Sequence, residues 1–168
     1  KGNAPLTFFP SLLQPSEHFL PVASAQVKSA LLLAGLYTDG PTAVIEPHKS
    51  RDHTERMLRG LGVPVTESED TQGRHRVTVS GALASLPPLD VQLPSDPSSA
   101  AFLVTAGLLV PDSDIEVTDL CLNPGRTGLF DVLRSMGGNL RVNDSSESNG
   151  EPTGTIAVEP GNLLGTTI

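Results

Sequence analysis

A short stretch from Ser24 to Ser29 gathers side chains that suit an anion. Ser24 offers a hydroxyl, Gln26 an amide and Lys28 an ammonium, where an apolar helical segment is expected to begin. The first turn of a helix also leaves backbone N–H groups without intrahelical partners, and its dipole favours negative charge. Phosphate is therefore the ligand that this combination fits. The alternative is that Ser24 is only a helix N-cap and that Gln26 and Lys28 solvate the first turn.

A second helix start, at Asp96, carries an acidic cap. Pro97 follows it, and aspartate at the N-cap with proline at the first helical position is a strong signal for a helix start. The two helix starts differ in charge. Only the one at Ser24 is expected to suit phosphate.

The residues that commonly bind metals are scattered along the sequence. The four histidines (His18, His48, His53 and His75) show no metal-ligand spacing, and Cys121 is the single cysteine. Cys121 is expected to be a plain buried thiol in a strand, and His53 to lie on a solvated helix face, with a neutral imidazole near the site as the alternative. No metal is predicted. No cofactor is expected either, since the glycine-rich phosphate loops of nucleotide sites are absent from the sequence.

Composition excludes several classes of partner. The chain has 168 residues, a formal net charge of -8 and 4% aromatic residues without tryptophan. It therefore lacks the basic surface and stacking rings that nucleic acid requires. Its longest apolar runs, 30–36 and 102–110, are well short of the roughly 20 residues that cross a bilayer. With no nucleic-acid or membrane partner and no leader segment, the expected location is the cytoplasm.

The elements that position these residues can be predicted from hydrophobic period and helix caps. In order they are a strand at 20–22, a helix from Ser24 to 36, a strand at 42–46, a helix after Asp52 and strands at 63–66 and 74–79. Asp52 and Glu55, three residues apart, predict a capping box at the second helix. The order is β-α-β-α-β-β.

The same order recurs in the second half of the chain. The second copy consists of a strand at 90–93, helices at 96–109 and 127–136, and strands at 115–120, 139–142 and 155–158. The polar stretch 143–154 is expected to be a solvated hairpin loop. Arg126 lies 75 residues after Arg51, and Gly137 lies 75 after Gly62.

A period near 75 is too long for common solenoids, whose repeats run roughly 20 to 50 residues, so the repeat is a small α/β lobe. The first helix of each copy is apolar nearly all round, and we expect sheet or other helices to enclose it.

Four motifs together resemble the enolpyruvyl transferase family that makes 5-enolpyruvylshikimate 3-phosphate. They are Pro-Val-Ala-Ser-Ala-Gln-Val-Lys-Ser at 21–29, Ser-Arg-Asp-His-Thr-Glu-Arg-Met-Leu at 50–58, Asp-Pro-Ser-Ser-Ala-Ala-Phe-Leu at 96–103 and Asn-Pro-x-Arg-Thr-Gly at 123–128. The resemblance covers essentially the whole chain and is closest to the bacterial form that has alanine in the middle of Ser-Ala-Gln.

The resemblance implies an α/β (α+β) fold, the two-lobed inside-out α/β barrel. That fold contains six β-α-β-α-β-β repeats, of which about two are present. Residues 1–92 would then be part of the first lobe, with the shikimate-phosphate-binding helix start. Residues 93–168 would be the crossover and the first repeat of the second lobe.

The resemblance also assigns roles to individual residues. Ser24 and the backbone N–H of Ala25 would hold the 3-phosphate of shikimate 3-phosphate, and Gln26 would lie between the shikimate ring and phosphoenolpyruvate. Arg51 resembles a basic residue that reaches the substrate, with an exposed charge beside Asp52 as the alternative. Ser50 either shares the site or only caps the helix.

Asp96 resembles an acidic residue at the lobe-to-lobe crossover, near the site, and is otherwise a plain N-cap. Ser95 stands where the family usually has glycine, which places a positive φ there in doubt. Arg126 repeats Arg51, but the resemblance assigns it no role beyond structure.

The activity implied is transfer of the enolpyruvyl group of phosphoenolpyruvate to the 5-hydroxyl of shikimate 3-phosphate, with release of phosphate. This step belongs to the shikimate pathway of chorismate and aromatic amino acid biosynthesis and is the target of glyphosate. Acid-base groups are needed, and the family's catalytic residues lie outside this sequence. No catalytic residue is therefore assigned to this chain, whose first residue is lysine and which is expected to be an inactive internal piece of its parent chain.

Two other functions remain open. One is a related enolpyruvyl transferase that acts on a nucleotide sugar such as UDP-N-acetylglucosamine. The other is a non-catalytic scaffold or binding module retained from a transferase ancestor.

Overall fold

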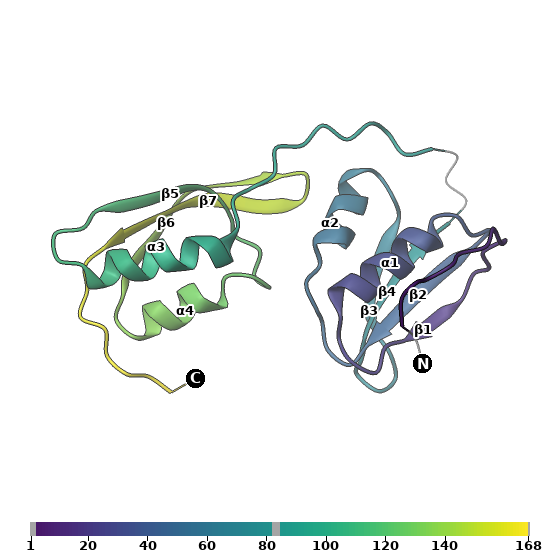
Figure 1. Cartoon of the computed structure of the whole chain (residues 1–168), viewed down its shortest axis with the longest axis horizontal. Coiled ribbons are helices and arrows are strands. Elements are labelled where there is room, and N and C mark those ends of the chain that lie inside the picture. Colours follow the sequence, from purple (N-terminus) through teal and green to yellow (C-terminus); the bar gives the residue numbers. More distant parts are fainter. Residues whose placement is uncertain (1–2, 82–84, 168) are drawn as a thin grey trace. The chain divides into compact units, whose positions relative to one another are not determined.

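A computed structural model describes residues 3–81 and 85–167 and divides the chain into two compact units (Figure 1). The first unit consists of residues 1–50 and 63–86, and the second of 51–62 and 87–168. The lobe boundary predicted between residues 92 and 93 refers to the two lobes of a larger protein, which are not these two compact units. It stays a prediction.

The first unit is a helix packed on a mixed sheet. It contains β1 (Glu17–Phe19), α1 (Ala25–Gly35), β2 (Pro41–Glu46), β3 (Val65–Glu69) and β4 (His75–Ser80). The strand order is β1-β2-β4-β3, with β1 parallel to β2 and the other pairs antiparallel. The side chains of β2 are buried from its second residue to its last, and α1 lies against β2 and β4 (Figure 1). The end of β2 therefore brings Glu46 beneath the helix.

The second unit packs two of its helices on one face of an antiparallel sheet. It contains α2 (His53–Gly60), α3 (Pro97–Leu109), β5 (Ile115–Cys121), α4 (Gly128–Ser135), β6 (Asn139–Ser148) and β7 (Glu151–Glu159). The strand order is β5-β7-β6. A single core joins α3, α4 and the sheet through residues such as Val104, Phe130 and Ile156. The two helices lie side by side in Figure 1.

The predicted repeat is confirmed in its main features. Along the chain, β1 to β4 with α1 and α2 follow the order β-α-β-α-β-β. Gly62 and Gly137, the repeated glycines, both adopt a positive φ, of 80° and 89°, directly after α2 and α4. This conformation ends a helix at little cost only for glycine.

The first strand of each copy differs from its prediction. The predicted strand 20–22 is replaced by β1 at 17–19, because pairing ends where the Leu20 N–H donates to the Ile45 carbonyl and Pro21 has no N–H. No strand forms at 90–93. Pro94 also lacks an N–H, and only Ser95 forms a bridge, parallel to Leu120. This bridge corresponds to the parallel pairing of β1 with β2.

The predicted loop at 143–154 is wrong. Strands β6 and β7 continue through this stretch and meet at Asn149 and Gly150, whose φ values of 50° and 83° fit a two-residue hairpin turn. The stretch is polar because the outer half of β6 is exposed.

The predicted enclosure of the apolar first helices is not found within the described residues. Phe102 of α3 is 80% exposed and Leu33 of α1 is 42% exposed. Each helix buries one side against its own sheet, and its opposite side faces solvent. Among the described residues, no helix has both the length and the apolar character needed to span a membrane.

Candidate functional site

The start of α1 presents a hydroxyl, an amide and backbone N–H groups. Ser24 is the N-cap, and its Oγ accepts a hydrogen bond from the Val27 N–H at 3.4 Å. Gln26 is exposed, and its Oε1 accepts from Ser24 Oγ at 3.4 Å. Ser24 and Ala25 are half-buried. The N-cap prediction is confirmed, and the polar groups of this first turn remain open to an anion.

Lys28 does not solvate the first turn or offer its charge to a ligand. Its side chain is 0% exposed, and its Nζ donates to Glu46 Oε1 at 2.7 Å and to the Ser50 carbonyl at 3.4 Å. The prediction that Lys28 binds an anion or solvates the first turn was wrong. A lysine in the first turn can be buried beneath the helix when a carboxylate there pairs with its charge. Glu46, the last residue of β2, supplies that carboxylate.

Ser50 is held by the same carboxylate. Glu46 Oε1 accepts from the Ser50 N–H at 3.0 Å, and Glu46 Oε2 accepts from Ser50 Oγ at 2.6 Å. One glutamate thus ties α1 to the segment after β2 within the first unit. Ser50 is positioned by this contact and does not cap α2, whose N-cap is Asp52.

The surroundings of Glu46 favour its charged form. Burial by itself raises the pKa of Glu46, but hydrogen bonds from Lys28 and Ser50 and the charge of Lys28 together lower it below its ordinary value of 4.5. His75 adds a further contact at 3.1 Å to Glu46 and one at 2.9 Å to Glu67. A charged buried pair therefore lies directly behind the α1 start.

Arg51 belongs to the second unit and its side chain is exposed. Its neighbour Asp52 is buried, and no capping hydrogen bond forms from the Asp52 side chain, so the predicted capping box is wrong. The Asp52 carboxylate instead accepts from Arg56 Nε at 2.9 Å and from Asn123 Nδ2 at 2.8 Å. One partner, Arg56, lies in the same helix and the other, Asn123, comes from a distant segment, and the carboxylate binds them in place of the helix N–H groups.

Asn123 is the main residue that sequence reasoning missed. It is 1% exposed, and besides Asp52 it donates to Glu151 Oε2 at 3.1 Å and accepts from the Gly125 N–H at 2.8 Å. The Asn-Pro-x-Arg-Thr-Gly motif was the available signal. Asn123 anchors Asp52, the residue next to Arg51, so the motif helps to position a residue that is predicted to bind substrate.

Asp96 caps α3, as predicted. Its carboxylate accepts from the Ser98 and Ser99 N–H groups, both at 3.2 Å, and it pairs with Arg126. Hydrogen bonding from the Ser98 backbone is the largest cause that lowers the pKa of Asp96, and the Arg126 charge also contributes. Arg126 thus has a structural contact with the start of α3.

Ser95 has no positive φ in this structure. Its N–H donates to the Asp119 carbonyl at 2.6 Å, and its carbonyl accepts from the Cys121 N–H at 3.0 Å. Serine therefore fits the strand-like backbone at this position without strain.

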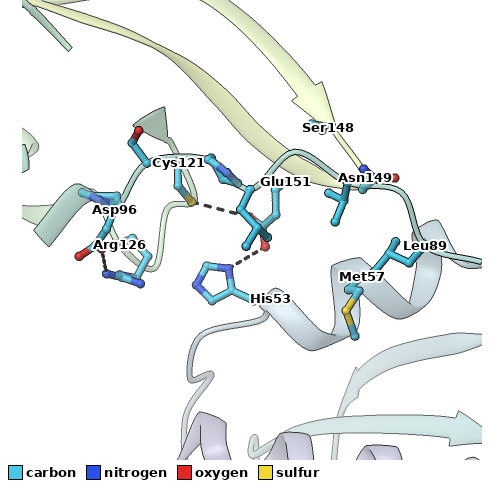
Figure 2. Close-up of a pocket in the computed structure, with 14 residues that line it drawn as sticks. His53, Met57, Leu89, Asp96, Cys121, Arg126, Ser148, Asn149 and Glu151 are labelled. Carbon is cyan, nitrogen blue, oxygen red and sulfur yellow. Dashed lines mark hydrogen bonds and ion pairs between the residues drawn. The ribbon is translucent and has the colours of Figure 1, made fainter. Parts of the chain in front are cut away.

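A second group of polar side chains meets in the second unit, where the sequence predicted scattered residues (Figure 2). His53 Nδ1 lies 2.6 Å from Glu151 Oε1, and Cys121 Sγ lies 3.9 Å from Glu151 Oε2. Cys121 is buried in β5 as predicted, and burial is the largest cause that raises its thiol pKa. His53 is not on a fully solvated face, since its side chain is only 38% exposed.

A cavity of about 400 Å³ adjoins this group. Its walls are formed by side chains of α2, the segment 89–97 and the tip of the β6–β7 hairpin. Figure 2 shows Met57 and Leu89 on one side and the Asp96–Arg126 pair on the other. The residues predicted to bind substrate, from Ser24 to Arg51, do not line it.

Comparison with known proteins identifies the family. The family model for EPSP synthase (3-phosphoshikimate 1-carboxyvinyltransferase) matches residues 1–163. The 3-phosphoshikimate 1-carboxyvinyltransferase of Anaeromyxobacter sp. (strain K) is 53% identical over 156 residues, which cover 93% of this chain and 34% of that protein. The protein of the same name from Novosphingobium aromaticivorans is 51% identical over 165 residues, which cover 98% and 37%.

A solved structure agrees with these sequence relatives. The EPSP synthase of Acinetobacter baumannii aligns with a TM-score of 0.78 and 39% identity over 88% of this chain and 32% of that structure. The chain therefore spans about a third of the length of its relatives. The predicted enolpyruvyl transferase fold is confirmed, and the chain belongs to the EPSP synthase (3-phosphoshikimate 1-carboxyvinyltransferase) family.

Proposed function

We propose that the protein carrying this chain transfers the enolpyruvyl group of phosphoenolpyruvate to the 5-hydroxyl of shikimate 3-phosphate and releases phosphate. This proposal rests on membership of the EPSP synthase family. Two relatives named 3-phosphoshikimate 1-carboxyvinyltransferase are 53% and 51% identical to this chain. Shikimate 3-phosphate and phosphoenolpyruvate would be its small-molecule partners. A cytoplasmic location and the role of glyphosate target belong to the same proposal.

In this proposal the start of α1 binds shikimate 3-phosphate. Ser24 Oγ and the Ala25 N–H hold the 3-phosphate, because a helix start combines free donors with a favourable dipole. Gln26 lies between the shikimate ring and phosphoenolpyruvate, which its exposure permits. Residues 1–92 would form part of one lobe of the parent enzyme, and residues 93–168 the crossover and the start of the next lobe.

Lys28 and Ser50 support this site from behind. Because Glu46 binds both residues, it fixes the register between the α1 start and the segment that leads to Arg51. Arg51 directly follows Ser50 in the chain. Its guanidinium is suited to donate two charge-assisted hydrogen bonds to one phosphate. Asp96 caps α3 and pairs with Arg126. We therefore propose that it lies near the crossover and does not contact substrate directly.

The isolated chain is proposed to be inactive. It supplies anion-binding groups, whereas the proton transfers of an addition and elimination need acid and base groups. These would come from the remainder of the parent chain. A phosphate-release assay on the isolated chain with both substrates would overturn this part of the proposal if it detected product.

The function is tested with Gln26→Ala in the full-length protein, with Gln72→Ala as the matched control. Gln72 lies exposed in the turn between β3 and β4. Gln26→Ala should lower kcat/KM for shikimate 3-phosphate by at least about tenfold, which corresponds to the loss of about 1.4 kcal/mol of transition-state stabilisation, and it should leave thermal unfolding unchanged.

Three results would count against the proposal. The first is an equal kcat/KM for Gln26→Ala and Gln72→Ala. The second is turnover of a UDP-sugar in place of shikimate 3-phosphate, and the third is no turnover of either substrate by the full-length wild-type protein. The second result would point to a nucleotide-sugar transferase and the third to a non-catalytic scaffold.

A further inference from the structure

A histidine, a cysteine and a glutamate from three separate elements of the second unit meet beside the cavity in Figure 2. His53 begins α2, Cys121 ends β5 and Glu151 begins β7. One ligand atom of each residue lies within 4.8 Å of the other two. We propose that His53, Cys121 and Glu151 form a binding site for a zinc ion.

The separations between these atoms are close to those that zinc requires. Bonds of about 2.0–2.3 Å in a tetrahedral arrangement place neighbouring ligand atoms roughly 3.3–3.8 Å apart. The separation of 2.6 Å between His53 Nδ1 and Glu151 Oε1 is shorter than this, and Cys121 Sγ lies 3.9 Å from the other carboxylate oxygen, Oε2. Each residue contributes one ligand atom, so the carboxylate would move away from Nδ1 and present a single oxygen to the metal.

The kinds of ligand favour zinc over magnesium or calcium. Thiolate and imidazole are soft or borderline ligands, whereas magnesium and calcium prefer sites made of oxygen atoms. A single carboxylate completes the set. On binding, the Cys121 S–H bond is replaced by an S–Zn bond and the thiol proton passes to solvent.

The charges around the group are compatible with a cation. Arg56 and Arg126 lie nearby, but each pairs with a carboxylate, of Asp52 and Asp96 respectively. The thiolate and the Glu151 carboxylate would together balance the charge of a zinc ion. Neither arginine therefore leaves an uncompensated positive charge that would repel the metal.

A second shell and an open position are also present. Asn123 Nδ2 donates to Glu151 Oε2 at 3.1 Å, the kind of outer contact that orients a metal-binding carboxylate. The adjoining cavity of about 400 Å³ leaves room for a water molecule as the fourth ligand.

Zinc at this position would connect the start of α2 to the sheet of the second unit. His53 stands two residues after Arg51, so the metal would also restrict the segment that carries this arginine. The site depends on none of the groups assigned to substrate binding. Its test can therefore fail or succeed independently of the proposed enzymatic activity.

The test uses the full-length, metal-free protein that carries this chain. Titration with cobalt(II) alone should give a near-ultraviolet thiolate-to-cobalt charge-transfer band and intense visible bands of a tetrahedral site. Zinc(II) added afterwards should remove both. In a chelator-competition assay, Cys121→Ser and Glu151→Gln should each weaken zinc binding by at least about tenfold, because each removes a direct ligand.

His48→Gln is the matched control for His53→Gln. His48 is exposed and outside the group, so its substitution should leave zinc affinity unchanged, whereas His53→Gln should weaken it. Far-ultraviolet circular dichroism checks that each variant is folded. A wild-type cobalt spectrum without the thiolate band, or equal zinc affinity in wild type and folded Cys121→Ser, would overturn the proposal even if another variant failed to fold.

Discussion

Asn123 reaches Asp52 through a 2.8 Å hydrogen bond between two buried side chains 71 residues apart. The same amide group also contacts Glu151, so one residue joins the segment after β5 to the starts of α2 and β7. This contact positions the residue beside Arg51. The Asn-Pro-x-Arg-Thr-Gly motif, through Asn123, thus holds the chain segment that contains Arg51 and Asp52.

Replacing Asn123 with alanine should destabilise the protein by about 2–4 kcal/mol. The substitution leaves the buried Asp52 carboxylate and the partly buried Glu151 carboxylate each short of a donor, and each lost partner of a buried group costs about 1–3 kcal/mol. Denaturant unfolding of the full-length protein measures the change. Asn162→Ala removes an exposed amide and should stay within about 0.5 kcal/mol of wild type. Equal losses in both variants would contradict the anchoring role.

Lys28→Met should cost about 3–5 kcal/mol of unfolding free energy, because it leaves the Glu46 charge buried without its ammonium partner. Lys49→Met is the matched control. The Lys49–Glu67 pair is 48% and 23% exposed, and such a pair contributes about 0–1 kcal/mol.

Adding Glu46→Gln to Lys28→Met should recover part of that loss. The double variant no longer has an unpaired buried charge, so the two substitutions should be strongly non-additive. Additive losses would show that the buried pair contributes little beyond the packing of its side chains.

Acid should destabilise the protein partly through Glu46. The pKa of Glu46 is lowered in the folded state, so its contribution is fully present above its ordinary value of 4.5 and is lost as the pH falls through the folded-state pKa. Glu46→Gln removes this titration. Its unfolding free energy should therefore fall less steeply than that of wild type below about pH 4.5. Parallel curves for the two proteins would show that Glu46 is not held in its charged form.

Arg51→Lys should raise the KM for shikimate 3-phosphate by about tenfold or more in the full-length enzyme. Lysine keeps the charge but loses the planar fork, and charge-assisted hydrogen bonds are each worth about 1.5–3 kcal/mol. Arg59→Lys, in the last turn of α2, should leave KM unchanged. A normal KM in Arg51→Lys would remove Arg51 from the proposed phosphate site.

The sequence by itself determined the local features whose causes lie within a few residues. Ser24 and Asp96 were predicted as N-caps because an N-cap bonds only to the next turn. Gly62 and Gly137, which the repeat paired, end α2 and α4 through their own positive φ, which is also a local property. The repeat and the four motifs were sufficient to indicate the family and fold.

Only the tertiary structure decided where polar side chains find their partners. Lys28 was expected to bind an anion or to solvate the first turn, Asp52 to cap its own helix and His53 to lie on a solvated face. Each instead has a partner from a distant strand or loop, Glu46, Asn123 and Glu151 respectively. A buried charge takes whichever partner the packing of sheet and helix brings within reach, and sequence spacing carries no record of that distance.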